Sequence, residues 1–261
     1  MYETLNYSVE NGVGVICLNR PDAANAMNPL MGKEINLVSL DISENPDVRA
    51  VVLTATGRMF CAGGDLSVFA SAGLGARRLM MEMAADLHLG LSRLARNRAP
   101  VIGAVNGTAA GAGFSLVMAC DLVLASEDAV FTMAYTKAGL SPDGSSTYFM
   151  PRRIGDRRTR ELMLTNRVLS ADEALDWGIV NRVVGKDELM AQTMALAKKI
   201  QSGPSLAFGK VKELLDSSFS QSLETQMELE ARAISEMVVT DDGQEGIYAF
   251  LEKRKPEFKG R

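Results

Sequence analysis

Two short turns made of small residues constrain this chain more than any other feature. The first, Phe60–Leu66, reads FCAGGDL, and the second, Asn106–Gly113, reads NGTAAGAG. Each follows an apolar, strand-like run and leads into a helical pattern. Small residues at such a junction let the backbone approach a ligand closely, and the first N–H groups of a helix have no intrahelical acceptor. The chain is therefore predicted to expose backbone donors at two places.

Backbone donors of this kind suit more than one ligand. Two N–H groups that converge on one oxygen form an oxyanion hole, which a few side chains from elsewhere must complete. A dinucleotide site fits poorly, because the second turn lacks the third glycine of G-x-G-x-x-G, and the chain has no G-x-x-x-x-G-K-[ST] phosphate loop. Taken singly, either turn is equally well explained as an ordinary junction between a strand and a helix.

The composition narrows the class of protein. A chain of 261 residues with 47% hydrophobic and 23% charged residues is typical of a globular protein with a sizeable core. Its net charge of −4 offers no basic surface to nucleic acid or an anionic membrane. The cysteines, Cys17, Cys61 and Cys120, lack a C-x-x-C spacing, which favours a reducing compartment and no structural metal. Without a leader-like start or an apolar run of roughly 18 residues, we expect a cytoplasmic protein that binds neither nucleic acid nor membrane.

Strand-like and helical patterns alternate along most of the chain, which predicts an α/β fold. Asn11-Gly12 separates two apolar runs and indicates a hairpin. Strands are predicted over Val51–Thr54, Val101–Val105 and Leu122–Ala125, and helices over Pro29 to about Asn45 and Ala76–Asn97. From about Asp187 the pattern is helical throughout: Glu188–Ser202, Pro204–Ser217, Ser222–Val238 and Asp241–Lys253. A helical tail of this kind often packs on another subunit.

A third motif, Asn19–Asn28 (NRPDAANAMN), precedes the two turns, and together the three resemble the crotonase, or enoyl-CoA hydratase/isomerase, superfamily. The resemblance covers nearly the whole chain and continues through Ala119–Ala125, Ala174–Val180, Glu245–Ile247 and Phe250–Phe258. It implies a ββα spiral core over residues 1–195 that binds acyl-CoA, and a C-terminal helical oligomerisation region over residues 196–261. It also implies a homotrimer or hexamer, with a coenzyme A thioester as substrate, no separate cofactor and no metal.

By the resemblance, the oxyanion-hole donors are the backbone N–H groups of Gly64 and Ala112. Relatives that hydrate enoyl-CoA use two glutamates, and the corresponding positions in this chain are Ser115 and Tyr135. Hydration needs an activated water and a proton donor at the two ends of a double bond, and neither side chain is a carboxylate. A two-glutamate hydratase is therefore disfavoured, although hydration by atypical residues stays open as an alternative.

The next carboxylate is Asp143, in the loop KAGLSPDGSS. This loop resembles that of single-carboxylate enoyl-CoA isomerases, among them the isomerase of ring-1,2-epoxyphenylacetyl-CoA in phenylacetate catabolism. The resemblance implies that Asp143 takes a proton alpha to the thioester of a 3-enoyl-CoA and returns it two carbons further along, which leaves the 2-enoyl-CoA. An apolar pocket would make such a carboxylate a better base. The competing interpretation is a turn aspartate, since Pro-Asp-Gly is a good turn sequence.

His88 supports a second enzymatic interpretation. The spacing of His88 and Asp143 resembles that of 4-chlorobenzoyl-CoA dehalogenase, in which an aspartate attacks the aromatic ring and a histidine assists hydrolysis of the covalent intermediate. A single histidine on a helix is, on the other hand, more often packed or solvated than catalytic. A third interpretation is a non-catalytic protein that binds RNA or serves assembly, which the acidic net charge and the presence of Asp143 disfavour.

Contacts with the ligand are also implied by the resemblance. The path of adenine and pantetheine is lined by Ala24, Ala26, Ala62, Asp65 and Leu66. Phe258 and Lys259 are expected to reach the nucleotide bound by a neighbouring subunit. Tyr135 is expected either to line an acyl or aryl pocket or to pack in the core. Many relatives have a basic residue where this chain has Ala24, so one phosphate contact is expected to be missing.

Overall fold

The computed structural model describes residues 2–261 and begins with the predicted hairpin. Strands β1 (Leu5–Glu10) and β2 (Val13–Leu18) pair antiparallel around Asn11 and Gly12. Both turn residues have positive φ, 50° and 77°, which is the conformation that Asn-Gly adopts readily in a two-residue hairpin. The remaining strands of this sheet are parallel to β2, so the hairpin supplies its antiparallel edge.

The strands form two sheets, and from β3 to β8 strands of the larger and the smaller sheet alternate along the chain. The larger has the order β1-β2-β3-β5-β7-β10, and its further strands are β3 (Ala50–Ala55), β5 (Val101–Val105), β7 (Leu122–Ser126) and β10 (Arg182–Val184). The smaller has the order β4-β6-β8-β9, with β4 (Met59–Cys61), β6 (Thr108–Ala110), β8 (Val130–Thr132) and β9 (Leu169–Ser170). Each of β3, β5 and β7 is followed by one strand of the smaller sheet and then by helix. This repeat confirms the α/β, ββα spiral fold that the resemblance implied.

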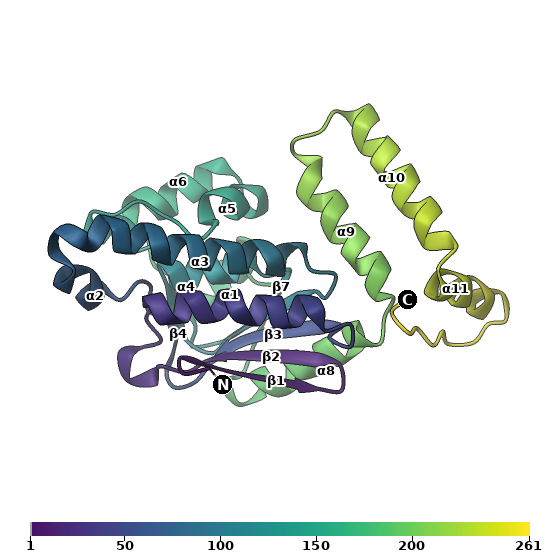
Figure 1. The fold of residues 1–261 in the computed structure, drawn as a ribbon, viewed down its shortest axis with the longest axis horizontal. Helices are drawn as coiled ribbons and strands as arrows, with labels where there is room; N and C mark the ends of the chain where they lie inside the picture. Colours follow the sequence, from purple (N-terminus) through teal and green to yellow (C-terminus); the bar gives the residue numbers. More distant parts are fainter. Residues whose placement is uncertain (1) are drawn as a thin grey trace.

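Helices cover both faces of the larger sheet, which explains why its central strands are apolar throughout. Helix α1 (Pro29–Glu44), capped by the Asn28 side chain, lies along α3 (Ala76–Arg96) on one face (Figure 1). Helix α8 (Leu189–Gln201) packs on the other, where Leu189 and Ala197 join a cluster with strand residues of β2, β3, β5 and β7. The remaining helices of the core are α2 (Leu66–Ser71), α4 (Ala112–Ala119), α5 (Ser146–Ile154), α6 (Asp156–Thr165) and α7 (Ala171–Asp176).

The last helices leave the sheets. Helix α9 (Ser205–Ser218) and α10 (Leu223–Val238) form an antiparallel pair that projects from the core, and α11 (Asp241–Leu251) lies at its base (Figure 1). The expected boundary at residue 195 falls inside α8, which packs on the sheet, so the projecting part begins with α9. Exposed apolar side chains lie along it: Leu215, Phe219, Leu223, Ile234 and Phe250. Among residues 2–261, no helix has the length and apolar character needed to span a membrane.

One ion pair joins α9 to the core. Lys212 Nζ lies 2.7 Å from Asp121 Oδ2 and donates to the carbonyl oxygen of Leu94 at 3.2 Å. The Asp121 carboxylate also accepts from the N–H of Val101 at 2.7 Å, at the beginning of β5. Asp121 therefore orders the beginning of β5 and anchors the first projecting helix at the same time.

Candidate active site

The two small-residue turns are in direct backbone contact. Gly63 has φ +104° and Gly111 has φ +51°, both in the region that favours glycine. A Cβ added to Gly63 would lie 3.2 Å from the carbonyl oxygen of Ala110 and 3.5 Å from Cα of Gly111. Only residues without a side chain allow the turns to approach this closely, so segments about fifty residues apart in the sequence meet through their main chains.

Each turn presents an N–H group that has no acceptor within residues 2–261. Met27 donates to the carbonyl oxygen of Gly63 at 2.7 Å, and Asp65 donates to that of Met27 at 2.9 Å. These bonds fix the backbone on either side of Gly64 and leave its N–H free. Ala112 is the first residue of α4, and its N–H is likewise free. The structure thus brings the two predicted oxyanion-hole donors to adjoining turns.

Beside the second turn, three polar side chains form a hydrogen-bonded cluster. The Tyr135 hydroxyl donates to Asp143 Oδ1 at 2.7 Å. Ser115 Oγ, on α4, lies 3.0 Å from the Tyr135 hydroxyl and donates to the main-chain oxygen of Asp143 at 2.9 Å. Gly144, at φ +59°, lets the loop pack against α4, because a Cβ there would lie 2.9 Å from Cβ of Ser115. Ser115 and Tyr135, neither of which carries a carboxylate, therefore bind the carboxylate of Asp143 and the loop that bears it.

His88 meets the same loop from α3. Its Nε2 accepts a hydrogen bond from the N–H of Gly144 at 3.2 Å and lies 3.6 Å from Asp143 Oδ2. The side chain of His88 is 47% exposed and that of Asp143 27%, so both reach solvent. They line a cavity of about 1090 Å³ between α3, α5 and α9, together with Leu91, Phe149, Leu206 and Ser217. The predicted pair of side chains is thus brought together.

Most of the predicted coenzyme A contacts also lie together, at the first turn. The N–H of Ala62 donates to the carbonyl oxygen of Ala24 at 3.0 Å, and Arg20 bonds both the carbonyl oxygen of Ala26 and the carboxylate of Asp65. Hydrogen bonding to Ser67 and the charge of Arg20 hold the pKa of Asp65 below its usual range. Asp65 therefore clasps the Asn19–Asn28 segment onto the turn, while the neighbouring Leu66 is exposed.

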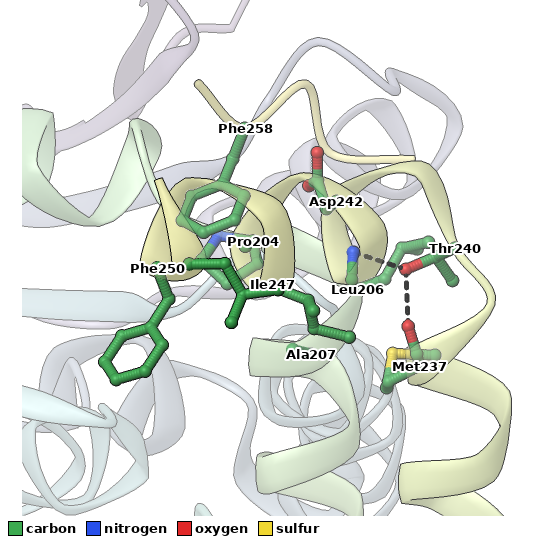
Figure 2. A pocket seen from close by; sticks show the side chains of 12 residues that line it. Pro204, Leu206, Ala207, Met237, Thr240, Asp242, Ile247, Phe250 and Phe258 are labelled. Carbon is green, nitrogen blue, oxygen red and sulfur yellow. Dashed lines mark hydrogen bonds between the residues drawn. The ribbon is translucent and has the colours of Figure 1, made fainter. Parts of the chain in front are cut away.

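The other two predicted contacts lie elsewhere on the same chain. Phe258 packs against Gly246 of α11 and lines an apolar pocket of about 410 Å³ with Pro204, Ile247 and Phe250 (Figure 2). The N–H of Lys259 donates to Asp242 Oδ1 at 2.6 Å. This C-terminal segment lies on the opposite side of the molecule from α2, which follows the first turn (Figure 1). Their expected role towards a neighbouring subunit stays a prediction.

The residues that sequence reasoning missed act through long-range contacts. The Gly144 N–H that binds His88 has no local signature, and Ser115 was noted only for lacking a carboxylate. Phe69 of α2 covers the first turn, since a Cβ on Gly64 would lie 3.0 Å from its ring. Cys61 is fully buried, and burial raises the pKa of its thiol to about 11, which favours the unreactive protonated form.

Similar proteins of known sequence and structure indicate the family. The model of the enoyl-CoA hydratase/isomerase family matches residues 8–261. The chain belongs to the enoyl-CoA hydratase/isomerase family. A Rhodobacter capsulatus protein named "Probable enoyl-CoA hydratase" is 38% identical over 100% of this chain and 99% of its own length. The 1,2-epoxyphenylacetyl-CoA isomerase of Escherichia coli is 36% identical, with both chains covered completely. The crystal structure of an enoyl-CoA hydratase from Polaromonas superposes with a TM-score of 0.93 at 32% identity, over 98% of this chain and 99% of that one.

Membership in the enoyl-CoA hydratase/isomerase family makes the chain an enzyme that acts on acyl-CoA. The names of its relatives include both hydratases and an isomerase. Overall similarity therefore leaves the reaction itself to be argued from the side chains at the site.

Proposed function

We propose that this enzyme shifts a double bond in an enoyl-CoA thioester, with Asp143 as the proton shuttle. The thioester oxygen binds between the N–H groups of Gly64 and Ala112. Asp143 removes a proton from C2 of a 3-enoyl-CoA, and the electrons of that bond form an enolate that the two donors stabilise. The double bond moves from C3–C4 to C2–C3, and Asp143 returns the proton to C4. No water enters the product.

The observation that carries this proposal is the single carboxylate of the cluster. Ser115 and Tyr135 turn toward Asp143 and hydrogen-bond to it or to its loop, and neither can hold a negative charge at neutral pH. The pKa of Tyr135 is raised, chiefly by burial and further by the charge of Asp143. Hydration needs an activated water and a separate acid, whereas a double-bond shift needs one group that accepts and returns a proton.

A second candidate, hydrolysis of an aryl-CoA through a covalent intermediate, is supported by the 3.6 Å between His88 Nε2 and Asp143 Oδ2. In that reaction His88 would have to accept a proton from water. Its Nε2 already accepts from the N–H of Gly144, which leaves the proton on Nδ1 and no free lone pair. This hydrogen bond favours the double-bond shift over hydrolysis.

The proposal extends to the substrate class and the assembly. The 36% identity to the E. coli isomerase makes an epoxyphenylacetyl-CoA-like thioester the second substrate class to assay, after linear 3-enoyl-CoA. The exposed apolar residues of α9, α10 and α11 support a homotrimer or hexamer, since such a surface is usually covered by another subunit. The enzyme needs no cofactor for a proton shuttle.

The test follows the ultraviolet band of the conjugated 2-enoyl thioester after the purified protein is mixed with a 3-enoyl-CoA. We expect the band to grow with the wild type, and Asp143→Asn to lower the rate by roughly 10²- to 10⁴-fold while the protein still folds and binds coenzyme A. Asp156→Asn, at an exposed aspartate paired with Arg160 on α6, is the matched control and keeps the wild-type rate. Near-native isomerisation by Asp143→Asn would refute the assignment.

A further inference from the structure

The two oxygens of the Asp143 carboxylate have different surroundings. Oδ1 accepts the hydrogen bond of the Tyr135 hydroxyl at 2.7 Å. Oδ2 lies 3.6 Å from His88 Nε2, and both Asp143 and His88 line the large cavity. Tyr135 does not belong to the residues that line this cavity. In the part of the chain that the structure describes, Oδ1 has a hydrogen-bond donor and Oδ2 has none, so one oxygen is tethered to the protein and the other is left to exchange a proton with a substrate.

Tyr135 is well suited to act as a permanent donor. Its ring packs beside the second turn, where a Cβ on Gly111 would lie 4.0 Å from Cε2 of the ring. Burial is the main cause that raises the pKa of its hydroxyl, so the phenol keeps its proton at neutral pH. Ser115 Oγ, fully buried on α4, lies 3.0 Å from the hydroxyl. The donor is thus fixed by α4 and by the turn that carries Ala112.

We propose that Tyr135 is a positioning residue that binds Oδ1 of Asp143 and thereby assigns the proton transfer to Oδ2. This inference rests on the proposed function, because it concerns the base of that reaction. A carboxylate fixed at one oxygen cannot rotate about its Cβ–Cγ bond, so the same oxygen that removes the proton from C2 delivers it to C4. The expectation that Tyr135 lines an acyl or aryl pocket stays a prediction beside this role.

The positioning role of Tyr135 is tested by following the proton that Asp143 transfers from C2 to C4. With a substrate deuterated at C2, the wild type transfers part of the label to C4 of the product. Tyr135→Phe keeps the ring but frees the carboxylate, which then rotates and exchanges its deuteron with water more often. We expect kcat to fall roughly ten- to a hundred-fold, the size of a hydrogen bond to a charged group, with KM within about two-fold and less label in the product. Unchanged kcat and label transfer would overturn the proposal.

The hydrogen bond between Tyr135 and Asp143, here called the tether, is tested without turnover by infrared difference spectroscopy of the carboxylate stretch. The difference between wild type and Tyr135→Phe should contain a carboxylate band that disappears when both proteins also carry Asp143→Asn. Tyr2→Phe is the matched control, because Tyr2 also donates to an aspartate, Asp41, on α1. Its band should persist in the Asp143→Asn background, and its kcat should equal that of the wild type.

The two measurements separate the two proposals. If the protein shows the Tyr135-dependent band but isomerises no enoyl-CoA, the hydrogen bond is supported and the proposed function is refuted. An active isomerase without that band, or with a band that survives Asp143→Asn, overturns the tether and leaves the function intact. A loss of folding in Tyr135→Phe would be seen in its melting temperature, and Tyr135→Trp, which offers an N–H donor on another aromatic ring, then tests whether a donor restores label transfer.

Discussion

The candidate site has two halves that are built in different ways. One half consists of main chain, the turns at Gly63–Gly64 and Gly111–Ala112, which touch because neither glycine has a side chain. The other half consists of side chains, those of His88, Asp143 and their hydrogen-bond partners, which come from α3, α4 and a loop. The first half is part of the fold, because its bonds are those that join strand to strand and strand to helix. The second half rests on that fold and contributes little to it.

This difference predicts how each half responds to mutation. In the main-chain half an added methyl group meets backbone atoms, which cannot move without disturbing two sheets. In the side-chain half His88 and Asp143 are partly exposed, so a substitution of either one alters the chemistry and leaves the packing nearly unchanged. A mutation in the main-chain half should therefore change the free energy of unfolding, and one in the side-chain half should change the catalytic rate.

The largest expected effect is that of Gly113→Ala in α4. A Cβ at this position would lie 2.4 Å from the carbonyl oxygen of Cys61 and 2.7 Å from its Cβ, both in the core. We expect the free energy of unfolding to fall by about 3 kcal/mol or more, enough to prevent folding of a marginal protein. Urea denaturation measures it.

Gly75→Ala is the matched control for this substitution. Gly75 precedes α3 at φ −77°, and a Cβ there meets nothing within 4 Å. The control should change the free energy of unfolding by less than about 1 kcal/mol, or raise it slightly, because alanine restricts the unfolded chain. Equal effects of the two substitutions would show that the close contact between the turns does not decide stability.

A smaller effect is expected for His88→Gln, in the side-chain half. The glutamine oxygen can accept the hydrogen bond of Gly144 that Nε2 accepts at 3.2 Å, but it cannot take up a proton from water. For a double-bond shift by Asp143, kcat should fall less than about ten-fold with the melting temperature unchanged. A loss of about 10² or more in kcat would favour the hydrolytic interpretation, in which the histidine is a base.

Each turn of the main-chain half could be predicted from the sequence because the signal of a turn is local, whereas the choice of Gly64 and Ala112 as donors came from the resemblance. Glycines after an apolar run indicate a close turn wherever they occur, and Asn11-Gly12 indicates a hairpin by the same logic. Strands β3, β5 and β7, helices α1 and α3 and the four C-terminal helices were also predicted from the sequence pattern, whereas the short strands β4 and β6 were not. The segment from β8 to β10 was not, because Pro151 lies inside α5 and β9 has only two residues, held by pairing with β8.

For the side-chain half, the sequence predicted two of the residues that take part but not the hydrogen bonds between the side chains. Asp143 and His88 were singled out by resemblance, and nothing in the residues themselves separated Asp143 from an ordinary turn aspartate. The bond between Tyr135 and Asp143 depends on how the loop closes at Gly144, which has φ +59° against α4. Such a bond follows from tertiary packing, so a sequence pattern holds no trace of it.

The smallest expected effect tests whether the main-chain half needs help from any side chain. Asp65, whose side chain is 14% exposed, lies 3.1 Å from Arg20 and ties the Asn19–Asn28 segment to the first turn. Its pKa is lowered in the folded protein, first by Ser67 and then by Arg20. The contribution of the ionised carboxylate to the free energy of unfolding is therefore present above the unfolded value of 3.8 and is lost as pH falls through the folded pKa.

Asp65→Asn should therefore lower the free energy of unfolding by about 1 kcal/mol at pH 7. The gap between wild type and variant should narrow once the pH drops below about 4, whereas Asp22→Asn, at an exposed position of the same segment, should show no gap at either pH. A gap that stays constant down to pH 2 would mean that shape, and not charge, holds the segment, which would place the clasp with the main-chain half of the site.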